Sequence, residues 1–131
     1  MIRAVPDTNV LVSGFVQRHP ASPSVQLLDA WRAGVFELLL SQEILIEVSR
    51  TLRKPYFRAR LSEDKIDRAM VLLLRRAQIV HISSEVEGVA THPEDDAILA
   101  TALSASADFL VTGARPAGPS ELSRNTEQVP T

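Results

Sequence analysis

The stretch IRAVPDTNVLVSG, residues 2–14, decides the fold expected for this chain. Its first part, Ile2 to Val5, is a short apolar run that stops at Pro6-Asp7. An apolar run bounded by turn residues predicts a buried strand, here one that ends at an acid. Residues 10–16 then predict a short helix that leads into a loop. The first question is therefore why a buried strand ends at a carboxylate.

Strand-like and helix-like segments alternate along the rest of the chain. Apolar runs predict strands at 36–40, 79–82 and 109–111, and helical spacing predicts helices at 24–33, 41–53 and 94–105. Ser62 is expected to cap one more helix, whose apolar face contains Ile66, Met70, Leu73 and Leu74. The alternation predicts an α/β fold with a mostly parallel sheet and helices on both faces. Sites in such sheets lie beyond the carboxyl ends of the strands, where Asp7, Ser41 and Thr112 are expected.

Composition limits the classes of function. The chain of 131 residues suits one compact domain, and its formal net charge of −2 gives no global signal for nucleic-acid binding. The absence of cysteine excludes disulfides, thiol nucleophiles and zinc–thiolate sites. The N-terminus lacks the apolar segment of a signal peptide, and no apolar run reaches the length of a membrane span. We therefore expect a soluble, cytoplasmic protein with no membrane partner.

Three acids stand beside apolar residues in otherwise apolar segments: Asp7, Glu47 and Asp96. A buried carboxylate without a partner is costly, and a hard divalent cation with oxygen ligands is one way to meet that cost. Mg²⁺ or Mn²⁺ held by these acids suits in-line attack of water on a phosphodiester. Asn9 is a candidate for orienting Asp7 or a bound water, and Ser41 either caps its helix or faces the cleft.

Each of these acids also has an ordinary structural interpretation. Asp7 suits a turn or a helix cap, and Glu47 suits the solvated face of a helix. Asp95 and Asp96 suit the first turn of a helix, where the helix dipole favours negative charge. The spacing of the acids alone leaves both interpretations open.

Basic residues are the expected contacts for RNA phosphates. Arg50, Arg53 and Lys54 follow Glu47 closely, and more arginines come after them. The alternative for this group is an exposed surface of mixed charge with no ligand.

Four segments together resemble the PIN domain family, in particular the VapC-like ribonuclease branch found as toxins of bacterial toxin–antitoxin pairs. These segments are DTNVLVSG (7–14), FELLLSQEILIEVSRTLRKPYF (36–57), HPEDDAILATAL (92–103) and ADFLVTG (107–113). The string DTNV alone is weakly specific, whereas four segments in the family's order and spacing are a strong signal. The resemblance covers most of residues 1–113, which we take as one PIN-like domain.

The resemblance implies a Rossmann-like three-layer α/β/α sandwich with a central, mostly parallel sheet. It also implies an endoribonuclease that depends on Mg²⁺ or Mn²⁺ and cleaves single-stranded RNA, with Asp7, Glu47 and Asp96 as catalytic and metal-binding acids. A homodimer and a cognate antitoxin protein that blocks the site are further implications. The positions expected to support the acids are Thr8, Asn9, Ser41, Asp95 and Thr112.

The resemblance ends at Ala114, where the family usually places a fourth acid. The tail, residues 114–131, is polar and proline-rich, and we expect it to be atypical, partly disordered and without the family's last strand. One permitted choice of codons for this tail, read one base later, gives PDLLALRSYRGT, which resembles the missing family segment. The hypothesis is a frameshift, which the nucleotide sequence around codon 114 tests. Loss of the last strand would expose one edge of the sheet.

Other functions compete with the ribonuclease. A haloacid dehalogenase-like phosphotransfer enzyme also starts from an acid after the first strand. It needs a second acid where this chain has Asn9, and a well-placed lysine, whereas only Lys54 and Lys65 are present. A catalytically impaired PIN-like module that binds RNA or antitoxin is favoured by Ala114 and the altered tail. A dinucleotide-binding domain is disfavoured because the first strand leads into DTNV and not into a glycine-rich turn.

Overall fold

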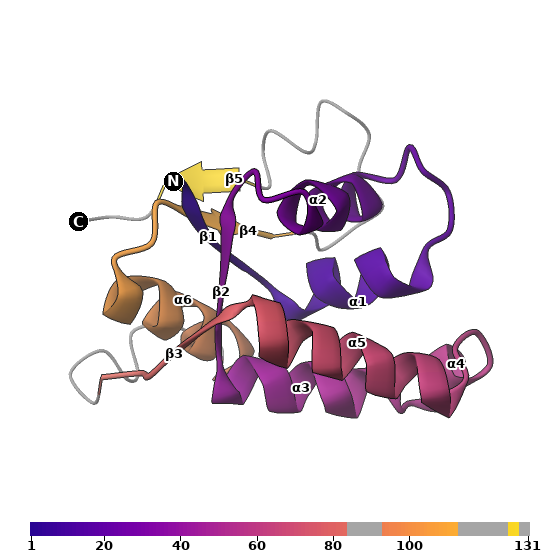
Figure 1. The fold of residues 1–131 in the computed structure, drawn as a ribbon. Coiled ribbons are helices and arrows are strands. Elements are labelled where there is room, and N and C mark those ends of the chain that lie inside the picture. Colours follow the sequence, from indigo (N-terminus) through magenta and orange to yellow (C-terminus); the bar gives the residue numbers. More distant parts are fainter. Residues whose placement is uncertain (84–92, 113–125, 129–131) are drawn as a thin grey trace.

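The computed structural model describes residues 1–83, 93–112 and 126–128, with the backbone alone at 93–96 and 126–128. Within these residues, five strands form one sheet in the order β3-β2-β1-β4-β5 (Figure 1). The first four strands are parallel to their neighbours, and β5 pairs antiparallel with β4. The mostly parallel sheet predicted from the sequence is therefore confirmed. The strands are β1 (Arg3–Pro6), β2 (Glu37–Ser41), β3 (Gln78–Val80), β4 (Phe109–Val111) and β5 (Thr126–Gln128).

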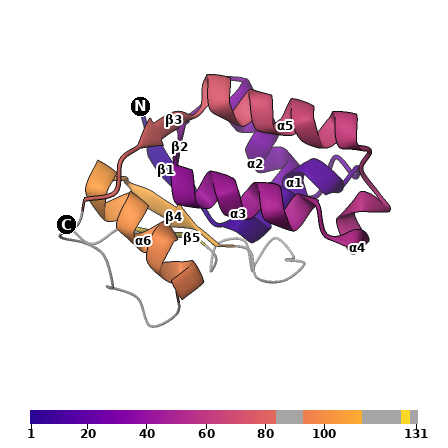
Figure 2. The same cartoon turned by 90° about the horizontal axis from the view of Figure 1, so that it is seen from below.

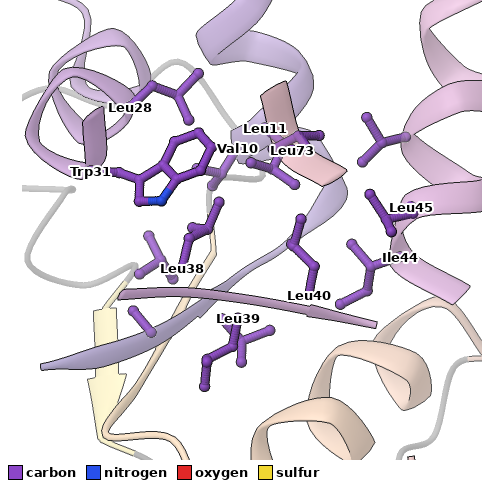
Figure 3. Close-up of a cluster of buried hydrophobic side chains, with 14 of the residues drawn as sticks. Val10, Leu11, Leu28, Trp31, Leu38, Leu39, Leu40, Ile44, Leu45 and Leu73 are labelled. Atoms are coloured by element: carbon purple, nitrogen blue, oxygen red, sulfur yellow. The ribbon is translucent and has the colours of Figure 1, made fainter. Parts of the chain in front are cut away.

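Helices lie on both faces of the sheet, as Figures 1 and 2 show from two directions. Helix α6 packs on β1, β2, β3 and β4, whereas α1 packs on α2 and α3. In the close-up of the core, Leu38 points toward Trp31 of α2, Leu40 lies on the same side of the strand, and Leu39 points to the opposite side (Figure 3). The result is the expected three-layer α/β/α arrangement. The helices are α1 (Thr8–Val16), α2 (Pro23–Arg32), α3 (Gln42–Leu52), α4 (Pro55–Arg58), α5 (Glu63–Arg76) and α6 (Pro93–Ala105).

Strand β2 explains why the sequence shows an unbroken apolar run instead of alternation. Leu38 is 1% exposed, and Leu39 and Leu40 are fully buried. Because β2 lies between β1 and β3 and has helices on both faces, the side chains from Leu38 to Ser41 all meet a packed layer. Burial of each such leucine contributes about 2 kcal/mol of hydrophobic free energy, before the loss of chain entropy is counted.

The helix starts and stops follow local signals in the sequence. Ser41 and Ser62 are N-caps, and their hydroxyls accept from the N–H groups of Ile44 at 3.4 Å and Lys65 at 3.3 Å. Gly34 follows the end of α2 with a φ of 81°, a left-handed conformation that glycine adopts without a Cβ clash. The caps at Ser41 and Ser62 were predicted, and the structure confirms them.

Several predicted boundaries differ from the structure. The strand expected at 79–82 is β3, Gln78–Val80, and it lies at an edge of the sheet with Ile79 45% exposed. Leu74 was expected on the apolar face of its helix but is 57% exposed, because α5 buries only a narrow stripe that includes Ile66 and Leu73. The short helix α4 was not predicted, and it starts at Pro55, as a helix with a proline at its first position often does.

The tail contains one strand that its sequence does not indicate. Thr126–Gln128 forms β5 and pairs with Phe109–Val111, so β4 has a neighbour on each side. The prediction that the tail leaves this edge of the sheet unpaired is wrong. Residues 113–125 and 129–131, and with them the expected disorder of the tail and Ala114, lie outside the described residues. None of the described helices is long and apolar enough to cross a membrane.

Candidate active site at the carboxyl edge of the sheet

Asp7, Ser41 and Thr112 lie together where three parallel strands end. The register of β1 with β4 places Asp7 beside Thr112, and the register of β1 with β2 places it beside Ser41. The backbone N–H of Asp7 donates to the carbonyl oxygen of Val111 at 2.9 Å, which holds the end of β1 against β4. The edge predicted from the sequence is therefore formed by the expected residues.

Helix α6 starts at this same edge. The helix ends at Ala105, and three residues later the N–H of Asp108 donates to the carbonyl oxygen of Arg3 at the start of β1. The C-terminus of α6 therefore lies at the amino ends of the strands. Since 13 residues of helix span about 20 Å, its first turn, which contains Asp95 and Asp96, lies beyond the carboxyl ends. The side chains of both acids are outside the described residues.

Asp7 is both the end of β1 and the N-cap of α1. Its side chain is 9% exposed, and its Oδ1 accepts from the N–H of Val10 at 2.8 Å. A carboxylate at a helix N-terminus is stabilised by this charged hydrogen bond and by the helix dipole. The fold thus keeps a carboxyl group almost out of contact with water at the sheet edge. The structural and the functional interpretations of Asp7 are compatible, because one carboxylate serves both.

The other predicted residues differ in their exposure. Glu47 lies in the second turn of α3 and is half-buried, between exposed Ile46 and fully buried Val48. It is therefore not a fully solvated surface acid. Thr8, in the first turn of α1, is 8% exposed, whereas Asn9 is exposed and donates no hydrogen bond to Asp7. Asn9 therefore does not orient the Asp7 carboxyl group through a hydrogen bond.

Ser41 does not face the cleft. Its side chain is fully buried, and its hydroxyl caps α3 and lies 2.8 Å from the hydroxyl of Thr101 in α6. Thr101, also fully buried, was not singled out in the sequence. A single threonine in an alanine- and leucine-rich helix gives no signal of its own, and its partner is 60 residues away along the chain.

The donor set of the edge suits a hard divalent cation. Asp7, Glu47 and Asp96 offer only carboxylate oxygens, which Mg²⁺ and Mn²⁺ prefer. Among the side chains that the structure describes, no three histidines or acids stand close enough to hold a metal. Asp7 and Glu47 are among these described side chains, whereas the side chain of Asp96 is not. The residues present therefore fit such an ion by chemistry and by the strand and helix ends that carry them.

The basic residues predicted to contact RNA are all exposed, but they are not equivalent. Arg53 is committed to neighbours, because its guanidinium pairs with Asp67 of α5 at 3.2 Å and donates to Ser49. Arg50 and Lys54 form no ion pair with any residue that the structure describes. Within the part of the chain that the structure describes, Arg53 therefore has an acidic partner, whereas Arg50 and Lys54 have none.

A comparison with protein families identifies one match, to the model described as PIN domain, over residues 3–115. The matched range stops just after Ala114, where the tail begins. No curated protein matches the sequence.

Among solved structures, the chain is similar to VapBC2 from Rickettsia felis, in a complex bound to a DNA fragment from the promoter of the pair. The TM-score is 0.56 and the sequence identity is 17%, over 95% of this chain and 93% of the other. At this identity the similarity concerns the fold, and it covers the sheet and the helices described above.

Proposed function

The chain belongs to the PIN domain family, and we propose that it is a metal-dependent endoribonuclease that cleaves single-stranded RNA. The observation that carries the proposal is Asp7, a buried carboxylate held by an α1 N–H at the edge where three strands end. A bound cation would add to the stabilisation that the cap hydrogen bond already gives this buried acid, and it would give the acid a function.

Asp7, Glu47 and Asp96 are the residues that would hold Mg²⁺ or Mn²⁺. When bound, such an ion supplies positive charge for a phosphodiester and lowers the pKa of water. The protein contributes the fixed positions of the three acids. Asp7 is held by its cap bond, Glu47 belongs to the packed helix α3, and the backbone of Asp96 lies in the first turn of α6.

The remaining roles concern the RNA strand. Asn9 is exposed next to Asp7 and is suited to bind a phosphate oxygen or a water through its side-chain amide. Thr112 follows β4 beside Asp7 and offers a hydroxyl at the same edge. Arg50 and Lys54 supply positive charge that attracts the RNA backbone without reading its bases.

The biological setting that we propose is a type II toxin–antitoxin pair. In this setting the chain is the toxin, acts in the cytoplasm as a homodimer and is blocked by a cognate antitoxin protein. The similarity in fold to VapBC2, whose structure contains a toxin–antitoxin complex, supports this proposal. A small antitoxin-like reading frame directly upstream of the gene would add independent support.

The test is cleavage of a mixed single-stranded RNA pool by purified protein, with and without Mg²⁺ or Mn²⁺. Asp7→Asn and Glu47→Gln are expected to abolish cleavage. Glu43→Gln, in the exposed first turn of α3, is the matched control and is expected to retain it. Cleavage without an added ion, or full activity of Asp7→Asn, would contradict the proposal.

A second candidate function has one observation in its favour. Ala114 stands where the family usually has a fourth acid, so the protein would then be an impaired PIN-like module that binds RNA or antitoxin without cutting. A folded protein that binds RNA but shows no cleavage with either ion would favour this candidate. Restoration of cleavage by Ala114→Asp would then identify the missing acid as the cause.

A further inference from the structure

Two buried hydroxyls connect the helix that carries Glu47 with the helix that carries Asp96. The Oγ1 of Thr101 lies 2.8 Å from the Oγ of Ser41 and 2.6 Å from the carbonyl oxygen of Ala97. The Oγ of Ser41 also accepts from the N–H of Ile44 at 3.4 Å. Both side chains are fully buried, so water does not compete for these bonds.

The direction of each hydrogen bond follows from the number of protons. A hydroxyl has one proton, and a carbonyl oxygen can only accept. Thr101 must therefore donate to Ala97, and the proton between the two hydroxyls comes from Ser41. The bonds form one directed chain, from the N–H of Ile44 through Ser41 and Thr101 to the carbonyl of Ala97. In this arrangement each hydroxyl donates once and accepts once.

One end of this hydrogen-bond chain directly follows a proposed metal ligand, and the other lies at the start of the helix that carries another. Ala97 directly follows Asp96 in α6, and Ser41 is the N-cap of the helix in which Glu47 occupies the second turn. The hydrogen-bond chain thus fixes the position of α6 along its axis relative to the start of α3. Loss of the Thr101 hydroxyl leaves the buried Ser41 hydroxyl without an acceptor, a cost that a shift of one helix end would relieve.

We infer that Thr101 is a positioning residue, which sets the distance between Glu47 and Asp96 through Ser41 and Ala97. The inference depends on the proposed function, because it concerns the metal-binding geometry of those acids. Groups that hydrogen-bond a metal ligand directly commonly change metal affinity about 10- to 100-fold when they are removed, and Thr101, which acts through the backbone beside Asp96, is expected at the lower end of that range. Thr101 has this effect without contact with the ion, since its hydroxyl is directed at Ser41 and at the backbone.

The test measures binding of Mn²⁺ alone, by the loss of the free-ion electron paramagnetic resonance signal on titration with protein. Thr101→Val keeps the shape of the side chain and removes the hydroxyl, and it is expected to weaken Mn²⁺ binding at least about 10-fold. Thr101→Ser restores the hydroxyl and is expected to bind within about threefold of wild type. Ile98→Val, on the same helix, removes one buried methylene and leaves the hydroxyl chain intact. It is expected to lower the melting temperature with unchanged Mn²⁺ affinity.

The outcomes separate this inference from the proposed function. If the wild-type protein and Thr101→Ser bind no Mn²⁺, the proposed metal site itself is wrong. If wild type binds Mn²⁺ and a folded Thr101→Val binds it equally well, the positioning role is overturned. If Thr101→Val does not fold, Ser41→Gly removes the other hydroxyl while keeping a residue accepted at an N-cap. Unchanged Mn²⁺ affinity in Ser41→Gly would likewise overturn the inference.

Discussion

Substitution of Asp7 separates its role as a helix cap from its role as a metal ligand. Asp7→Ala removes the acceptor of the 2.8 Å bond from the N–H of Val10 and leaves that buried N–H without a partner. Loss of a cap costs about 0.5–2 kcal/mol, and an unsatisfied buried donor moves the cost toward the upper limit. At about 4 °C per kcal/mol for a domain of this size, a loss of about 2 kcal/mol lowers the melting temperature by about 8 °C. Asp7→Asn keeps an oxygen that caps equally well, so its change is expected to stay below about 2 °C.

The second half of this prediction uses the ion. At an Mn²⁺ concentration 100-fold above its dissociation constant, binding to the native state adds about 2.7 kcal/mol of stability. The wild-type melting temperature, followed by circular dichroism at 222 nm, should therefore rise by about 11 °C over its value in chelator. Asp7→Asn should show no such rise. An equal rise in the melting temperature of Asp7→Asn would mean that Asp7 is a cap only. If Asp7→Asn in chelator lost as much stability as Asp7→Ala, the cap geometry would be refuted.

Three further predictions test packing, charge and capping. Gly14→Ala is expected to destabilise the protein by about 1–3 kcal/mol in urea unfolding, because an added Cβ would lie 2.5 Å from the Cδ1 of Leu28; an unchanged midpoint would contradict this packing. Arg50→Ala is expected to weaken binding of labelled single-stranded RNA and to lower the slope of log affinity against log salt concentration by about 0.7. Arg53→Ala should change the affinity and the slope less, because the guanidinium of Arg53 already has an acidic partner. Fluorescence anisotropy at several salt concentrations measures the affinity and the slope. Ser62→Ala is expected to cost about 1 kcal/mol through loss of the α5 cap, with no change in Mn²⁺ affinity, and a change in that affinity would argue against a purely local role.

The fold was predictable because most of its signals are local. Apolar runs, helical spacing and cap residues such as Ser41 and Ser62 act within a few residues of chain, and a parallel sheet follows from their alternation. The errors arose where one residue signals both the end of a helix and the start of another, or where a partner distant in sequence determines the local structure. Pro55 both ends α3 and begins α4, and Thr126–Gln128 becomes a strand only because β4 offers it an edge.

Only some residues of the candidate site could be predicted from the sequence. Asp7 was visible because an acid that ends a buried strand is unusual, and its neighbours Ser41 and Thr112 follow from the parallel register. Thr101 was not visible, since its hydrogen bond spans 60 positions and helix α6 shows no polar pattern around it. Residues that act on substrate leave motifs in sequence, whereas residues that hold those motifs in place are found only through three-dimensional contacts.

The charge balance of the carboxyl edge leads to one more expectation. The helices that begin there, α1, α3 and α6, have N-termini that favour anions, but they also carry Asp7, Glu47 and Asp96 as three proposed ligands. The N–H of Val10 at the start of α1 is already occupied by Asp7, and the net charge of −2 gives RNA no general attraction. The acids would thus repel a phosphate until a cation neutralises them. A divalent ion is therefore expected to strengthen the binding of single-stranded RNA and not only its cleavage. The measurement is the affinity for a non-cleavable RNA analogue in Mn²⁺ and in chelator. Equal affinity in both would show that the acids do not face the bound phosphate.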